Sequence, residues 1–79
     1  MNKILIVGLG SMGKRRIRNL QKLGYHNLFG FDLRDDRILE TKKKYKIQCF
    51  NNFQNALDEK PSIMLICTPP HLHKEYGKK

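Results

Sequence analysis

Three glycines near the start of the chain, Gly8, Gly10 and Gly13, have the spacing G-x-G-x-x-G. They directly follow the apolar run Ile4–Val7 and precede a stretch from Lys14 to Leu23 that contains no helix breaker. A strand, this glycine pattern and a helix in that order are typical of a turn that binds the diphosphate of a dinucleotide. The pattern alone is common, and its position between a strand and a helix gives it weight.

Each glycine has a separate physical role in such a turn. Gly8 permits a tight bend, Gly10 lets a diphosphate approach the backbone, and Gly13 lets the helix pack closely on the strand. We expect the backbone amides of Gly10, Ser11 and Met12 to face the phosphates, together with the positive end of the helix dipole.

Asp32 supplies an independent sign of the same chemistry. It ends a second apolar run, Leu28–Phe31, and lies about 20 residues after the last glycine, where such folds place the carboxylate that binds the adenosine ribose. A carboxylate accepts hydrogen bonds from a diol and repels a 2′-phosphate, so Asp32 favours NAD over NADP. Arg34 works in the opposite direction, because it could pair with a phosphate, and it leaves NADP open. The alternative is a glycine turn without a ligand, with Asp32 capping the next helix.

The remaining pattern predicts the elements that position these residues. Further helices are expected at Asp35–Tyr45 and after Asn52, and further strands at Ile47–Phe50 and Ile63–Cys67. Strands that alternate with helices indicate a parallel sheet with right-handed crossovers. The prediction is an α/β fold: a truncated Rossmann domain of about four strands in the order 3-2-1-4, with helices on both faces.

Composition excludes several other classes of protein. The chain has 79 residues, a net charge of +9 and 39% hydrophobic residues, which is too apolar for a disordered basic tail. No apolar run is long enough for a membrane span or a signal peptide. The two cysteines fit neither a disulfide scaffold nor a metal site. We expect a cytoplasmic domain without a metal or a membrane partner.

The segment Ile66–His73, with the sequence ICTPPHLH, resembles the end of the fourth strand in the Gfo/Idh/MocA oxidoreductase family. The opening IVGLGSMGK of Ile6–Lys14 is similar to the first turn of the same family. The resemblance implies an N-terminal NAD(P)-binding Rossmann domain in an enzyme that transfers hydride to or from a sugar, cyclitol or nucleotide-sugar. It also implies that Thr68 and Pro69 lie beside the diphosphate and the nicotinamide ribose, and that His73 begins the next helix.

One feature departs from that family. Its catalytic lysine belongs to a Glu-Lys-Pro triplet after the fifth strand, whereas Glu59-Lys60-Pro61 precedes the fourth strand here. We interpret this triplet as a helix end followed by a turn, and no catalytic residue is carried over. Residues 1–79 are therefore expected to be the N-terminal part of a dinucleotide-binding domain, a fragment that lacks the substrate domain and does not turn over alone.

The order 3-2-1-4 leaves the strand Ile63–Cys67 at one edge of the sheet. This strand contains no charge and no proline, and an apolar edge of that kind pairs readily with another chain. We expect the chain to self-associate through it.

Two alternative functions follow from the sequence. The charge of +9, with Arg15, Arg16, Arg18 and Lys22 on one predicted helix, could neutralise nucleic-acid phosphates. The basic residues are spread over two helices, however, and no aromatic residues lie between them to stack on bases, which argues against nucleic acid. The second alternative is a non-catalytic regulator that senses NAD, since the fold alone does not decide function.

Overall fold

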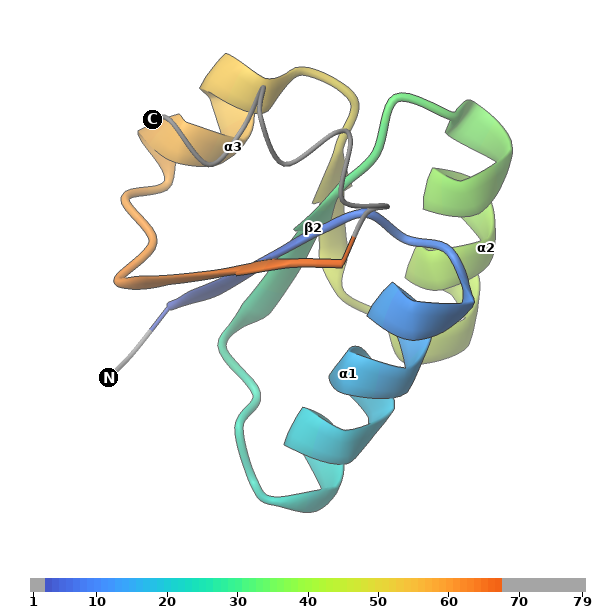
Figure 1. Cartoon of the computed structure of the whole chain (residues 1–79), viewed down its shortest axis with the longest axis vertical. Helices are drawn as coiled ribbons and strands as arrows, with labels where there is room; N and C mark the ends of the chain where they lie inside the picture. The colour runs from blue at the N-terminus through green and yellow to red at the C-terminus, as the bar shows by residue number, and fades with distance from the viewer. Residues whose placement is uncertain (1–2, 68–79) are drawn as a thin grey trace.

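Seven elements alternate strictly between strand and helix. The computed structural model describes residues 3–67. In chain order the elements are β1 (Ile4–Val7), α1 (Ser11–Lys22), β2 (Leu28–Phe31), α2 (Asp35–Tyr45), β3 (Gln48–Phe50), α3 (Phe53–Asp58) and β4 (Ile63–Ile66). All strand pairs are parallel, and the order β3-β2-β1-β4 (Figure 1) confirms the predicted topology.

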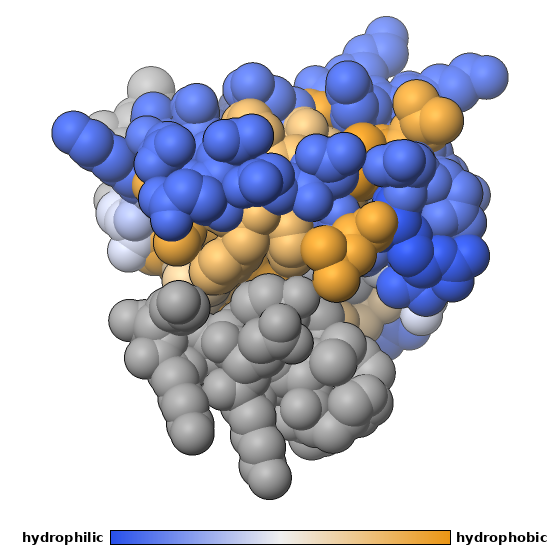
Figure 2. All heavy atoms as spheres, turned by 90° about the horizontal axis from the view of Figure 1, so that it is seen from above, coloured by the Kyte–Doolittle hydropathy of each residue, from blue (hydrophilic) through white to orange (hydrophobic). Residues whose placement is uncertain are grey.

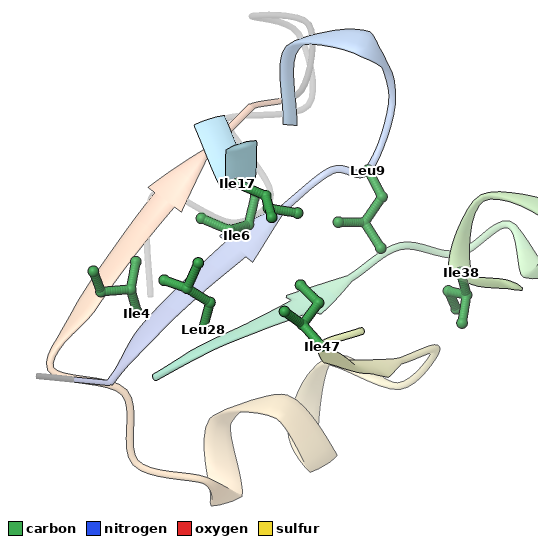
Figure 3. Close-up of a cluster of buried hydrophobic side chains, with 7 residues drawn as sticks. All are labelled: Ile4, Ile6, Leu9, Ile17, Leu28, Ile38 and Ile47. Atoms are coloured by element: carbon green, nitrogen blue, oxygen red, sulfur yellow. The ribbon is translucent and has the colours of Figure 1, made fainter. Parts of the chain in front are cut away.

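Helices cover both faces of the sheet, as predicted. Alternate residues of each strand point to opposite faces, so β1 contributes Ile4 and Ile6 to one buried cluster and Leu5 and Val7 to another. The first cluster (Figure 3) lies under α1 and α2 and comprises Ile4, Ile6, Leu9, Ile17, Leu28, Ile38 and Ile47. The second lies against α3 and comprises Leu5, Val7, Phe29, Phe31 and Ala56. Strand β1 is thus buried on both faces, which explains its uninterrupted apolar sequence.

The helix ends follow from local sequence. Helix α1 ends at a cap formed by Leu23, and Gly24 after it has φ of 95°, a left-handed conformation that glycine adopts without strain. Helix α2 has Asp35 and Asp36 in its first turn and three lysines in its last, which matches the helix dipole at both ends. The Asn52 side chain accepts a hydrogen bond from the Asn55 amide and caps α3, as predicted.

Two details differ from the sequence prediction. Helix α1 begins at Ser11 rather than Lys14, so Gly13 lies in its first turn, where close contact with β1 outweighs the low helix propensity of glycine. Strand β4 is half-buried after an exposed Ile63, whereas its uninterrupted apolar sequence is typical of a strand that is buried on both faces. Its position at the edge of the sheet explains this, because it has a neighbouring strand only on the β1 side within residues 3–67.

Hydrophilic side chains cover much of one face of the described chain. Figure 2 shows these side chains around a group of apolar side chains that lies near the middle of the view. The arginines Arg15, Arg16 and Arg18 of α1 are exposed, as expected for a solvated helix face. Over the described part of the chain, none of the helices has the length and apolar character needed to cross a membrane.

Substituting alanine for Gly13 tests the packing of α1 on β1. A Cβ on Gly13 would overlap the carbonyl oxygen of Gly8, which is backbone and cannot rotate away. We expect Gly13→Ala to lower the free energy of unfolding by about 1–3 kcal/mol, measured by urea denaturation. The control Asn19→Ala, at an exposed position of α1, should change it by less than about 0.5 kcal/mol. Equal midpoints for both variants would contradict the close contact.

Candidate functional site

The predicted ribose carboxylate lies at the end of β2 and is tied to the glycine-rich turn. Asp32 directly follows β2, which is the neighbour of β1 in the sheet. Its Oδ2 accepts a hydrogen bond from the Leu9 amide at 2.8 Å, and its Oδ1 accepts one from the Arg34 amide at 2.9 Å. The residue is 7% exposed. Each carboxylate oxygen has a second lone pair, so Asp32 retains the capacity to accept hydrogen bonds from a ribose diol.

The first and third glycines are required by the protein itself. Gly8 has φ of 98°, which is unfavourable for a residue with a side chain, and its amide donates to the Phe31 carbonyl at 2.8 Å. Gly13 has no room for a Cβ against Gly8. These two positions bear out the tight turn and the close helix–strand packing that the spacing predicts.

Gly10 has no comparable requirement within the fold. The three atoms of the described chain nearest to a Cβ on Gly10 belong to the guanidinium of Arg37, with Nη1 at 3.5 Å, an ordinary contact. Its φ of −76° is open to any residue. Glycine at this position is therefore not needed by the fold, and the absence of a side chain beside the Arg37 guanidinium agrees with the approach of a ligand to the backbone.

The start of α1 presents backbone amides that the helix does not use. The amide of Lys14 donates to the Gly10 carbonyl at 3.0 Å, which leaves the preceding first-turn amides without a partner inside the helix. Ser11 and Met12 are exposed, and Gly10 is half-buried. These residues thus lie at the surface of the described chain, and with the helix dipole their amides make this end of α1 suited to an anion.

Leu9 is a positioning residue that the sequence analysis missed. Its side chain is fully buried in the cluster under α1 and α2, while its amide is held by Asp32. A Cβ on Gly30, in the middle of β2, would lie 2.8 Å from Leu9 Cδ2. The glycine in an otherwise bulky strand was the available signal, because it marks a place where another group approaches the strand closely.

Two arginines of the β2–α2 segment occupy different positions. The guanidinium of Arg34 donates to both carboxylate oxygens of Asp36, at 3.1 and 2.8 Å. The hydrogen bond from Arg34 lowers the pKa of the Asp36 carboxyl. The arginine that faces Asp32 is Arg37, with Nη1 3.6 Å from Oδ2. Arg37 was not singled out from the sequence.

Strand β4 ends beside the glycine-rich turn. The amide of Cys67 donates to the carbonyl of Val7 at 2.7 Å, and Val7 directly precedes Gly8. Cys67 therefore lies at the same end of the strands as the candidate site. The predicted site residues Thr68, Pro69 and His73 lie outside the described residues.

The Glu59-Lys60-Pro61 triplet lies at the opposite end of the strands from the candidate site. It follows α3 and precedes β4, with Lys60 in a left-handed conformation at φ of 56°. The Lys3 ammonium, just before β1, donates to the Glu59 carbonyl at 3.0 Å. The triplet is a helix end and a turn, as predicted, and it is remote from Asp32. Within residues 3–67 no group of three or more His, Cys, Asp or Glu residues is placed to hold a metal.

Comparisons with known proteins agree with this geometry. The model of the Gfo/Idh/MocA family, an oxidoreductase family with an NAD-binding Rossmann fold, matches residues 2–79. Among solved structures, the chain is similar to prephenate dehydrogenase from A. aeolicus in complex with hydroxyphenyl propionate and NAD+, with a TM-score of 0.91 and 24% identity. That match covers 99% of this chain and 28% of the other, and it shows the fold alone. No curated protein gives a significant match.

The tie between Asp32 and the turn predicts a structural effect of removing this carboxylate. Asp32→Ala leaves the amides of Leu9 and Arg34 without acceptors, and we expect it to lower the free energy of unfolding by about 1–3 kcal/mol in urea denaturation. Asp32→Asn keeps one acceptor oxygen and should lose less. The control Asp58→Ala removes an exposed carboxylate at the end of α3 and should stay within about 0.5 kcal/mol of wild type. If Asp32→Ala matched that control, the tie would contribute nothing to stability.

Proposed function

The chain belongs to the Gfo/Idh/MocA family of oxidoreductases with an NAD-binding Rossmann fold, and from this premise we propose which of its residues hold the cofactor. The backbone amides of Gly10, Ser11 and Met12 bind the diphosphate. Asp32 binds the diol of the adenosine ribose. Gly8 and Gly13 act indirectly, by giving the turn its shape.

The hydrogen bond between Asp32 and the Leu9 amide supports this proposal most directly. It fixes the carboxylate against the turn whose next residues offer exposed amides. A diphosphate and its neighbouring ribose need an anion site and a diol acceptor side by side, and the end of α1 and Asp32 supply these two. Ligands of open parallel sheets bind at the carboxyl ends of the strands, and both of these features lie at that end.

Thr68, Pro69 and His73 complete the proposed site through the family resemblance. Val7 and Cys67 are joined by a backbone hydrogen bond, which supports a position for the following segment close to the turn. Proline has no amide to donate, so Pro69 would shape the loop beside the nicotinamide ribose. Thr68 would contact the same part of the cofactor, and His73 would stand at the start of the next helix.

For the activity, we propose hydride transfer between NAD and a sugar, cyclitol or nucleotide-sugar, carried out by a protein of which this chain supplies the dinucleotide-binding part. The family membership supports the reaction type. The chain spans 28% of the length of the solved dehydrogenase it matches, and a Glu-Lys-Pro triplet encoded about one further βα unit after Lys79 would support an enzyme. Its absence from a longer gene product would favour a regulator that senses NAD.

Titration with NADH tests the proposed cofactor site. The chain contains no tryptophan, so the fluorescence of NADH can be followed without interference from protein indole groups. We expect saturable binding, and Asp32→Asn should weaken it at least about tenfold, the effect of losing a hydrogen bond to a charged group. Asp58→Asn makes the same change of charge at the opposite end of the strands and should leave the affinity for NADH unchanged.

Two outcomes would contradict the proposed site. Equal weakening by both variants would show that net charge, rather than a contact at Asp32, governs the affinity. Binding of duplex DNA that falls steeply with salt, without any NADH signal, would favour a nucleic-acid function for the basic surface. Circular dichroism of each variant confirms that the fold is retained.

We also propose that the isolated chain self-associates through β4. Within the described residues this strand has a neighbour on one side only, and Ile63 is 39% exposed. Backbone groups along the outer side of an apolar edge strand are free to pair with a second copy.

Light scattering tests this association. We expect the mean mass to rise with concentration up to about 100 μM, a range in which exposed strand edges associate. Ile63→Lys should shift the chain towards the monomer, because an edge lysine opposes pairing. Leu39→Lys changes an exposed apolar residue on α2 and serves as the control. A monodisperse wild-type monomer at the highest concentration would rule the proposal out.

We propose a cytoplasmic location for the protein. Its two cysteines, Cys49 and Cys67, are not joined in a disulfide, and a domain that does not use a disulfide for stability is compatible with a reducing compartment. Burial raises the pKa of the Cys49 thiol to about 11, which keeps it protonated and inert at neutral pH.

A further inference from the structure

A guanidinium lies between the two halves of the candidate site. Arg37 Nη1 is 3.6 Å from Asp32 Oδ2, and it would be 3.5 Å from a Cβ on Gly10. The side chain of Arg37 is 40% exposed, whereas that of Asp32 is 9% exposed. The guanidinium therefore lies beside the carboxylate and next to the position that a side chain of residue 10 would take.

The position of Arg37 is determined by the packing of α2 on α1. Glu40, three residues later on α2, forms a salt bridge with Lys14 of α1. Residues three apart lie on the same helix face, so this face of α2 looks towards the start of α1. The next residue, Ile38, is buried in the cluster under both helices and fixes the rotation of α2. Arg37 is thus directed at the turn by the core.

Arg34, the arginine suggested by the sequence, is held elsewhere. Its guanidinium makes two hydrogen bonds with Asp36, and the side chains of this pair are 60% and 65% exposed. Arg34 approaches Asp32 only through its backbone amide. Of these two arginines, Arg37 is the one whose charge lies against the carboxylate.

A carboxylate at the adenosine ribose discriminates against NADP because it repels the 2′-phosphate. A guanidinium within 4 Å offsets that repulsion, and it also offers paired N–H donors with the geometry that phosphate requires. Resting on the cofactor site proposed above, we propose that Arg37 determines specificity at the adenosine ribose: it neutralises part of the charge of Asp32 and binds the 2′-phosphate, so the domain accepts NADP as well as NAD.

Parallel titrations with NADH and NADPH test this inference. Arg37→Gln should weaken NADPH binding at least about tenfold, the effect of one lost hydrogen bond to a charged group, and should change NADH binding less than about threefold. Arg37→Lys keeps the charge and should retain part of the NADPH affinity. Arg34→Gln is the matched control, with the same change of residue two positions from Asp32, and should leave the ratio of the two affinities unchanged.

The outcomes separate this inference from the proposed function. If wild type binds NADH but not NADPH, or if Arg37→Gln leaves the ratio of affinities unaltered, Arg37 has no such role and the NAD site stands. A change of ratio in Arg34→Gln alone would assign the role to Arg34 and overturn the inference. If wild type binds neither nucleotide, the proposed function falls and the inference with it.

Discussion

The hydrogen bond from the Leu9 amide to Asp32 is the constraint on which the site depends. It joins the turn after β1 to the end of β2, two segments that are separated by the whole of α1 in sequence. Two further contacts hold the same turn: the Leu9 side chain is buried in the cluster under α1 and α2, and Gly13 packs closely against Gly8. With these three restraints, the exposed amides at the start of α1 have a fixed direction relative to the carboxylate. A preorganised site of this kind loses little entropy when a ligand binds.

The electrostatic character of the site comes from a few neighbouring groups rather than from the net charge of +9. The helix dipole and the amides of the first turn favour an anion, and Asp32 favours a hydroxyl group. Arg37 lies where these two preferences meet. The lysines and arginines elsewhere on α1 and α2 lie mainly on exposed faces, where salt screens their effect. The position of the Arg37 guanidinium is therefore a better guide to the proposed cofactor site than the net charge of the chain.

The topology explains why the residues of the candidate site lie close together. All the strand pairs are parallel, so the carboxyl ends of β1, β2 and β4 point in the same direction. The Glu59-Lys60-Pro61 turn lies at the other end of the strands, although its sequence matches the catalytic triplet of the family. A short motif thus carries information only together with its place in the fold, because the chemistry requires its groups to meet in space.

The sequence by itself determined the order of elements, the parallel sheet and the place of the glycine-rich turn between β1 and α1. Apolar runs such as Ile4–Val7, glycines at positions 8 and 13, and an aspartate at the end of the next strand are local signals, and each acts through the backbone near it. Only the tertiary structure decided that Leu9 anchors the turn and that Arg37 rather than Arg34 faces Asp32. These outcomes depend on how α2 packs on α1 and on the sheet, and contacts between distant segments leave no periodic mark in the sequence.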